Sequence, residues 1–217
     1  MNRHTVRGLR YPYPYVIKYF FKVGLDQKPG SVLELGCGNG CNLQLFRDFD
    51  WRCVGVDYDL QAIDDALANF LHDDPSRIDF YEWDLNAGML PLAESFDVLL
   101  IPNFVYYLGR EVLGSLLTEC RGLLSEEASF MLSCRSTGDW RYGRGLQISD
   151  KAFIIDTDLT GEIGAHMAFY EPEEMVSLIE GSLGRISNLV VLRHDYENLQ
   201  RGEVINNHDF VVWGSLA

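Results

Sequence analysis

The stretch Ser31-Val-Leu-Glu-Leu-Gly36-Cys-Gly-Asn-Gly40 joins an apolar run to three glycines that stand two residues apart. The run predicts a buried strand over 31–35, and the glycines predict a tight turn into a helix. Such a turn lets the backbone approach a ligand closely and presents N–H groups at a helix N-terminus. The dinucleotide fingerprint has its third glycine where Cys41 stands here. Glu34 beside the turn suits a ligand with a cationic ammonium better than one with two phosphates.

Downstream of this turn, short apolar runs alternate with amphipathic stretches, which is typical of βαβ units and a parallel sheet. Further strands are expected at 53–56, 78–83, 98–101, 129–133, 189–193 and 210–213, with a polar segment at 197–209 between the last two. Helices are expected at 41–46, 60–71, 111–124 and 171–180. We therefore predict an α/β fold: a Rossmann-like, doubly wound, seven-stranded, mostly parallel sheet whose last strand is antiparallel. A small inserted β-hairpin or loop is expected after strand five.

Composition excludes several classes of protein. The formal net charge is −14, and nucleic-acid binding depends on clustered Lys and Arg, so no nucleic-acid partner is expected. The five cysteines form no C-x-x-C pair and no zinc-ligand spacing, which predicts reduced thiols and no metal. The sequence has no secretory signal core and no apolar run near the ~20 residues that span a bilayer. We expect a cytoplasmic protein that does not bind membranes.

The segment Val32–Gly40 resembles the first motif of class I S-adenosylmethionine-dependent methyltransferases. In that family the acid and the glycine turn hold the methionine end of the cofactor. A second acid stands at the end of the next strand and binds the ribose hydroxyls, and Asp57 matches it. A third acid follows strand three and faces the adenine amino group, and Asp84 matches it. The ribose hydroxyls and the adenine amino group are hydrogen-bond donors, and carboxylate oxygens accept hydrogen bonds from both. The resemblance, over about 30–135, implies S-adenosyl-L-methionine bound by Glu34, Gly36, Cys37, Gly38, Gly40, Asp57, Tyr58, Asp84, Leu85, Asn103 and Tyr11.

The 217 residues are expected to form a single methyltransferase domain with two additions. Residues 1–29 are predicted to cap the cofactor, as N-terminal segments do in many small-molecule methyltransferases. Within them, each proline of Arg10–Tyr15 keeps the preceding tyrosine extended, so this stretch is expected to cross a surface rather than begin a helix. Residues 136–171 are predicted to be an insertion that forms part of the acceptor site.

The acceptor side is less defined, because methyl transfer depends mainly on positioning and needs no particular residue type. Loops at the carboxyl ends of strands supply candidates. For binding the acceptor these are Tyr107, Arg135, Asp139, Arg141 and Arg144; for catalysis they are His166, His208 and Tyr106. Three arginines in an acidic protein suggest an anionic group on the acceptor. Salt bridges to nearby acids are the alternative, and a structural role stays open for each histidine.

The sequence Ile101-Pro-Asn-Phe104 lacks the second proline and the leading Asp or Asn of DNA amino-methyltransferases. We therefore predict an enzyme (EC 2.1.1.-) that methylates an O or N atom of a small molecule, as a monomer or homodimer. A non-catalytic S-adenosylmethionine-binding regulatory or scaffold protein is the main alternative. An NAD-dependent oxidoreductase is a more distant one.

Overall fold

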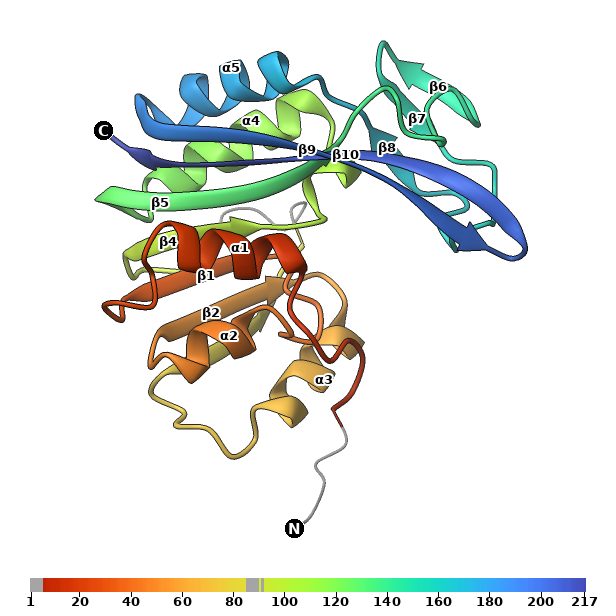
Figure 1. The fold of residues 1–217 in the computed structure, drawn as a ribbon. Helices are drawn as coiled ribbons and strands as arrows, with labels where there is room; N and C mark the ends of the chain where they lie inside the picture. Colours follow the sequence, from red (N-terminus) through yellow and green to blue (C-terminus); the bar gives the residue numbers. More distant parts are fainter. Residues whose placement is uncertain (1–5, 85–89, 91) are drawn as a thin grey trace. The chain divides into compact units, whose positions relative to one another are not determined.

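The computed structural model describes residues 6–84, 90 and 92–217. It divides into two compact units, Met1–Pro102 with Gly122–Met131, and Asn103–Arg121 with Leu132–Ala217. The main sheet has seven strands in the order β3-β2-β1-β4-β5-β10-β9 (Figure 1).

The first unit holds the parallel strands and three helices. Its strands are β1 (Ser31–Leu35), β2 (Arg52–Asp57), β3 (Ile78–Glu82), β4 (Phe96–Ile101) and the first part of β5 (Leu124–Arg135). Its helices are α1 (Pro14–Lys22), α2 (Leu43–Asp48) and α3 (Leu60–Asn69). Strand β1 pairs in parallel with both β2 and β4, and β2 pairs with β3. Strands buried on both faces read as apolar runs, which explains why these segments were recognisable in the sequence.

The second unit contains the antiparallel part of the main sheet and a smaller sheet. Its elements are η2 (Val105–Tyr107), α4 (Arg110–Arg121), β6 (Leu146–Ser149), β7 (Ala152–Ile154), β8 (His166–Ala168), α5 (Pro172–Leu183), β9 (Ile186–Gln200) and β10 (Glu203–Leu216). Strands β9 and β10 form a long antiparallel hairpin. Strands β6, β7 and β8 form a separate antiparallel sheet, drawn in turquoise in Figure 1.

The predicted fold class is confirmed, down to the limits of the first strand. The insertion after strand five is a three-stranded sheet, one strand more than a hairpin. The expectation of a polar connection over 197–209 was wrong, because most of this segment is strand. Gln200 pairs with Glu203, and the two residues between them, Arg201 and Gly202, have φ of 49° and 87°. Two successive positive φ angles make the tight turn that joins antiparallel strands.

The N-terminal stretch also differs from the expectation in one respect. Tyr13 is extended, with φ −57° and ψ 130°, as the proline after it requires. Helix α1 nevertheless begins inside the stretch, at Pro14, because a proline in the first helical turn has no N–H to leave unsatisfied. None of the helices in the described part of the chain is long and apolar enough to cross a membrane.

Candidate active site

Glu34 is a fully buried carboxyl group near the end of β1. Its Oε1 accepts a hydrogen bond from Asn42 Nδ2 at 2.6 Å. Its Oε2 is buried and has no hydrogen-bond partner among the described residues. Burial raises the pKa of Glu34 to about 8; the Asn42 hydrogen bond opposes that rise, and the negative charge of Asp57 adds to it. One oxygen of this acid is therefore held in place while the other is available to a cation.

The glycine turn after β1 is left-handed at Gly36, Gly38 and Gly40, with φ of 69°, 53° and 77°. A Cβ on Gly40 would lie 2.7 Å from the Phe70 ring, so this glycine is required by packing as well as by its backbone angle. A Cβ on Gly38 would meet nothing within 4 Å. The turn is thus packed tightly on the side of Gly40 and open at Gly38.

Asp57 ends β2 and closes this turn from the neighbouring strand. Its Oδ2 accepts the backbone N–H of Gly38 at 2.8 Å, and its Oδ1 accepts that of Asp59 at 3.0 Å. A carboxylate has about four lone-pair sites, so two remain for hydroxyl groups. Cys37, between Glu34 and Asp57 in the chain, is a buried thiol whose pKa is raised well above its usual range by desolvation, which leaves it unreactive.

Two asparagines that were not predicted as site residues, Asn39 and Asn42, hold the N-terminal segment against this turn. Asn39 Nδ2 donates to the carbonyl oxygens of Arg7 and Leu9, and Asn42 Oδ1 accepts the backbone N–H of Tyr13 at 2.8 Å. Both asparagines lie in or beside the glycine turn, where a side-chain amide can bond backbone groups. Their position was the only signal in the sequence.

The other residues predicted to bind the cofactor are placed as follows. Tyr11 and Tyr58 are 76% and 72% exposed, and Asp84 is exposed just after β3. Leu85 lies outside the described residues. Asn103 belongs to the second unit and is left-handed, with φ 56°; its N–H donates to Ser133 Oγ at 2.7 Å.

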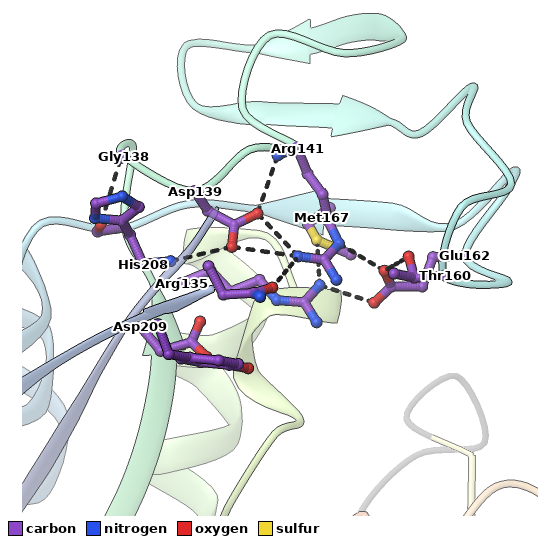
Figure 2. A network of polar contacts seen from close by, with 12 residues as sticks. Arg135, Gly138, Asp139, Arg141, Thr160, Glu162, Met167, His208 and Asp209 are labelled. Carbon is purple, nitrogen blue, oxygen red and sulfur yellow. Dashed lines mark hydrogen bonds and ion pairs between the residues drawn. The ribbon is translucent and has the colours of Figure 1, made fainter. Parts of the chain in front are cut away.

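Two of the three predicted substrate-binding arginines are paired with carboxylates of their own unit (Figure 2). Arg141 Nη1 lies 2.9 Å from Asp139 Oδ1, and its Nε lies 2.6 Å from Glu162 Oε2. Arg135 Nη1 lies 2.8 Å from Glu162 Oε1. Arg135 and Arg141 are both buried, whereas Arg144 is exposed and contacts the Trp140 ring. The structure therefore contains the salt bridges that were the alternative to an anionic acceptor.

The tyrosines that follow β4 contact the same ion-pair network. Arg135 stacks on the ring of Tyr106, with the guanidinium carbon 3.9 Å from the ring centroid. Tyr106 is buried, and desolvation raises the pKa of its hydroxyl far above the usual value. Tyr107 is partly exposed, and its hydroxyl donates to Glu162 Oε1 at 3.4 Å. Glu162 thus joins both arginines and one tyrosine, although its place in the chain carries no sequence signal for such a role.

The two candidate histidines have different surroundings. His208 Nδ1 lies 3.2 Å from Asp195 Oδ1, and the backbone N–H of His208 donates to Asp139 Oδ2 at 3.3 Å. His166, on β8, has a buried Nδ1 without a hydrogen-bond partner in the described part of the chain. Within residues 6–84, 90 and 92–217, no cluster of His, Cys, Asp and Glu is arranged to hold a metal ion.

Comparison with known proteins agrees with this arrangement. Residues 32–127 match a family model described as a methyltransferase domain. A SAM-dependent methyltransferase from Methanosarcina mazei has a TM-score of 0.71 over 95% of this chain and 98% of its own, at 19% identity. A SAM-dependent methyltransferase from Clostridium acetobutylicum has a TM-score of 0.64 over 94% and 91%, at 13% identity.

A third similar structure is the Burkholderia thailandensis 1,6-didemethyltoxoflavin-N1-methyltransferase, with 1,6-didemethyltoxoflavin and S-adenosylhomocysteine bound. Its TM-score is 0.64 over 94% of this chain and 77% of its own, at 16% identity. No curated protein matches the chain.

The sheet order and the glycine turn define a Rossmann-like α/β protein of the methyltransferase type. Residues 32–127 match the methyltransferase-domain model, and the chain as a whole has the fold of S-adenosylmethionine-dependent methyltransferases. The methyltransferase fold predicted from the sequence is confirmed, and the resemblance to S-adenosylmethionine-dependent enzymes agrees with both comparisons.

Proposed function

We propose that the protein transfers the methyl group of S-adenosylmethionine to an oxygen or nitrogen atom of a small-molecule acceptor. The observation that carries this proposal is the unpartnered Oε2 of Glu34. A buried carboxyl group without a partner is destabilising unless something satisfies it. The ammonium group of the donor is a cation of suitable size beside an open glycine turn, and it would lower the raised pKa of Glu34 on binding.

The remaining donor contacts are those that the resemblance to the family implies. Asp57, held by the Gly38 and Asp59 N–H groups, would bind the ribose hydroxyls. The other proposed donor contacts are Gly36, Cys37, Gly40, Tyr11, Tyr58, Asp84, Leu85 and Asn103. When bound, the donor supplies an electrophilic methyl group on a sulfonium. The protein's share is to orient that group and exclude water from it.

Three observations support a small, uncharged acceptor. The net charge of −14 disfavours nucleic acids. One structure with the same fold is described as a methyltransferase of 1,6-didemethyltoxoflavin, a small molecule. Arg135 and Arg141 are paired with Asp139 and Glu162, which weakens the argument for an anionic acceptor.

The acceptor-side roles remain proposals for Tyr107, Arg135, Asp139, Arg141 and Arg144 in binding and for His166, His208 and Tyr106 in catalysis. We also propose a cytoplasmic monomer or homodimer. The five free cysteines, all of them buried, support a reducing compartment.

Isothermal titration calorimetry with S-adenosylhomocysteine tests the donor part of the proposal. We expect a dissociation constant in the micromolar range or below, and a thermal shift with S-adenosylhomocysteine but not with NAD. Folded protein that gives no heat with S-adenosylhomocysteine would refute the proposal. Tight binding with no turnover across a broad panel of acceptors and labelled donor would favour a regulatory or scaffold role.

A further inference from the structure

Strand β10 carries two buried polar atoms that have no hydrogen-bond partner among the described residues, Asn207 Nδ2 and Asp209 Oδ1. Residues two apart on a strand share a face, so these side chains lie on the same side of β10. Arg141 Nη1, which can only donate, lies 3.2 Å from Asn207 Oδ1. That contact fixes the orientation of the amide and leaves its NH₂ as the unused group. A donor without a partner and an acceptor without a partner therefore lie on the same face of β10.

This face lies beside the carboxyl end of β5. The backbone N–H of Ser136, the residue after β5, donates to the carbonyl oxygen of His208 at 2.8 Å. Open α/β sheets bind ligands at the carboxyl ends of their parallel strands. Figure 2 shows the Asp209 side chain next to Arg135. The Asn207 amide and the Asp209 carboxylate therefore lie at the edge of the sheet where a ligand is expected.

The charges around this face are nearly balanced without Asp209. The two guanidinium groups of Arg135 and Arg141 are matched by the two carboxylates of Asp139 and Glu162. Asp209 adds a negative charge that no ion pair neutralises in the described residues. An anionic ligand would increase this imbalance, whereas an N–H donor would relieve it.

The groups that face Asp209 come from several elements. Burial raises the pKa of its carboxyl to about 6; Arg135 and Arg141 oppose that rise, and Asp139 adds to it. From β9, the Tyr196 hydroxyl donates to Asp209 Oδ2 at 3.5 Å, and His194 is the register partner. The Tyr106 hydroxyl and the Cys134 thiol also lie within its electrostatic range. The carboxyl is therefore mostly ionised at pH 7, and it is held by one long hydrogen bond.

We propose that the Asn207–Asp209 face of β10 binds the acceptor substrate, and that this substrate presents an N–H group next to a carbonyl oxygen or ring nitrogen. Lactams and N-heterocycles have such an edge. The N–H donates to the Asp209 carboxylate, and the neighbouring acceptor atom takes a hydrogen from the Asn207 amide. The terminal torsion of an aspartate is broad, so rotation of the carboxyl group presents Oδ1 to the ligand. This inference rests on the proposed function, whose acceptor it specifies.

A matched pair of probes tests this inference. The compound 2-pyridone offers the N–H and the carbonyl side by side, and N-methyl-2-pyridone lacks only the N–H. Each is titrated into ¹⁵N-labelled protein while the side-chain NH₂ signals of Asn207 are followed by NMR. We expect 2-pyridone to shift these signals saturably and to bind at least tenfold more tightly than the N-methyl compound.

Two variants locate the effect at Asp209. Asp209→Asn removes the charge and should weaken 2-pyridone binding about tenfold, because charge-assisted hydrogen bonds are roughly twice as strong as neutral ones. Glu197→Gln removes an exposed charge from the same hairpin and should bind 2-pyridone like the wild type. Spectral dispersion checks that each variant is folded, and the wild-type comparison of the two probes decides the question even if Asp209→Asn is not.

Four results would overturn the inference: no shift with 2-pyridone, equal binding of the two probes, unchanged binding by folded Asp209→Asn, or competition by inorganic phosphate. Binding of S-adenosylhomocysteine is measured in the same samples. Its absence would refute the proposed function, whereas its presence with no 2-pyridone binding would refute only the acceptor assignment.

Discussion

The Asn42 side chain bridges the buried acid and the N-terminal segment: its Nδ2 donates to Glu34 Oε1 at 2.6 Å, and its Oδ1 accepts the N–H of Tyr13 at 2.8 Å. Both contacts use the same side-chain amide, so a movement of Glu34 is transmitted through Asn42 to the backbone of Tyr13. A ligand that draws Glu34 toward itself therefore acts on the residue just before helix α1.

We expect Asn42→Leu to weaken S-adenosylhomocysteine binding by about tenfold, because it removes the hydrogen bond that orients and acidifies Glu34. The same change frees the Tyr13 N–H, so hydrogen exchange should become faster at the start of α1. Calorimetry and exchange mass spectrometry measure the two effects. Asn69→Leu frees the Arg7 backbone groups and the Asn39 carbonyl oxygen but leaves both Asn42 contacts in place, so as the control it should lose less affinity than Asn42→Leu. Equal losses in both variants would contradict the role given to Asn42.

Glu34→Gln should stabilise the free protein and weaken donor binding. The pKa of Glu34 is raised from 4.5 to about 8 by burial, so the folded state holds a proton that the unfolded state releases between these values. Wild-type stability is therefore lost as pH rises from about 4.5 to 8, whereas the glutamine variant does not titrate.

The advantage of Glu34→Gln should be near zero at pH 4 and grow to on the order of 5 kcal/mol above pH 8, at about 1.4 kcal/mol per pKa unit. Chemical denaturation across this pH range measures it. Glu82→Gln, at an exposed position of β3, is the control for removing a carboxylate. A constant difference between Glu34→Gln and wild type at all pH values would show that Glu34 does not titrate in this window.

Asp57→Ala should weaken S-adenosylhomocysteine binding by one to two powers of ten and leave the fold intact. Lost charge-assisted hydrogen bonds are worth about 1.5–3 kcal/mol. Calorimetry measures the affinity, with exposed Asp64→Ala on α3 as the control. An unchanged dissociation constant would mean that the ribose is bound elsewhere.

Site residues could be predicted from the sequence where their position is specified by neighbouring residues, and not where their partners are distant in the chain. Glu34, the glycines and Asp57 were predictable because each stands at the end of a strand that its own neighbours specify. Glu162 was not, because it meets Arg135 and Arg141 across 27 and 21 residues of the insertion. The Arg201-Gly202 turn had a sequence signal in its glycine, but the surrounding polar residues were interpreted as a loop. Those residues lie on an exposed hairpin, where polar side chains are compatible with a strand.

The glycine turn provides a matched pair of substitutions. Gly38→Ala places a Cβ in open space at φ 53°, so only the left-handed backbone is penalised, by about 1–2 kcal/mol. Gly40→Ala adds a Cβ 2.7 Å from the Phe70 ring, and overpacking adds about 1–3 kcal/mol. Gly40→Ala should therefore be clearly the less stable of the two in urea denaturation. The opposite order would show that the Phe70 and Phe80 rings move aside freely.

Arg141 and Arg144 stand three residues apart in one loop but should differ sharply when replaced by methionine. Arg141→Met leaves the buried Asp139 carboxylate without its guanidinium and removes one of the two partners of Glu162. Breaking a buried pair from one side destabilises by about 3–5 kcal/mol. The Arg144 side chain is exposed and stacks on the Trp140 ring, so its loss should change stability by less than about 1 kcal/mol. Chemical denaturation at pH 7 measures the free energy of unfolding of both variants. The double variant Arg141→Met with Asp139→Asn should recover part of the loss, because the unpaired carboxylate charge is gone.

If Arg141→Met were as stable as Arg144→Met, the buried guanidinium would not be needed for the fold and would again be available to an anionic acceptor.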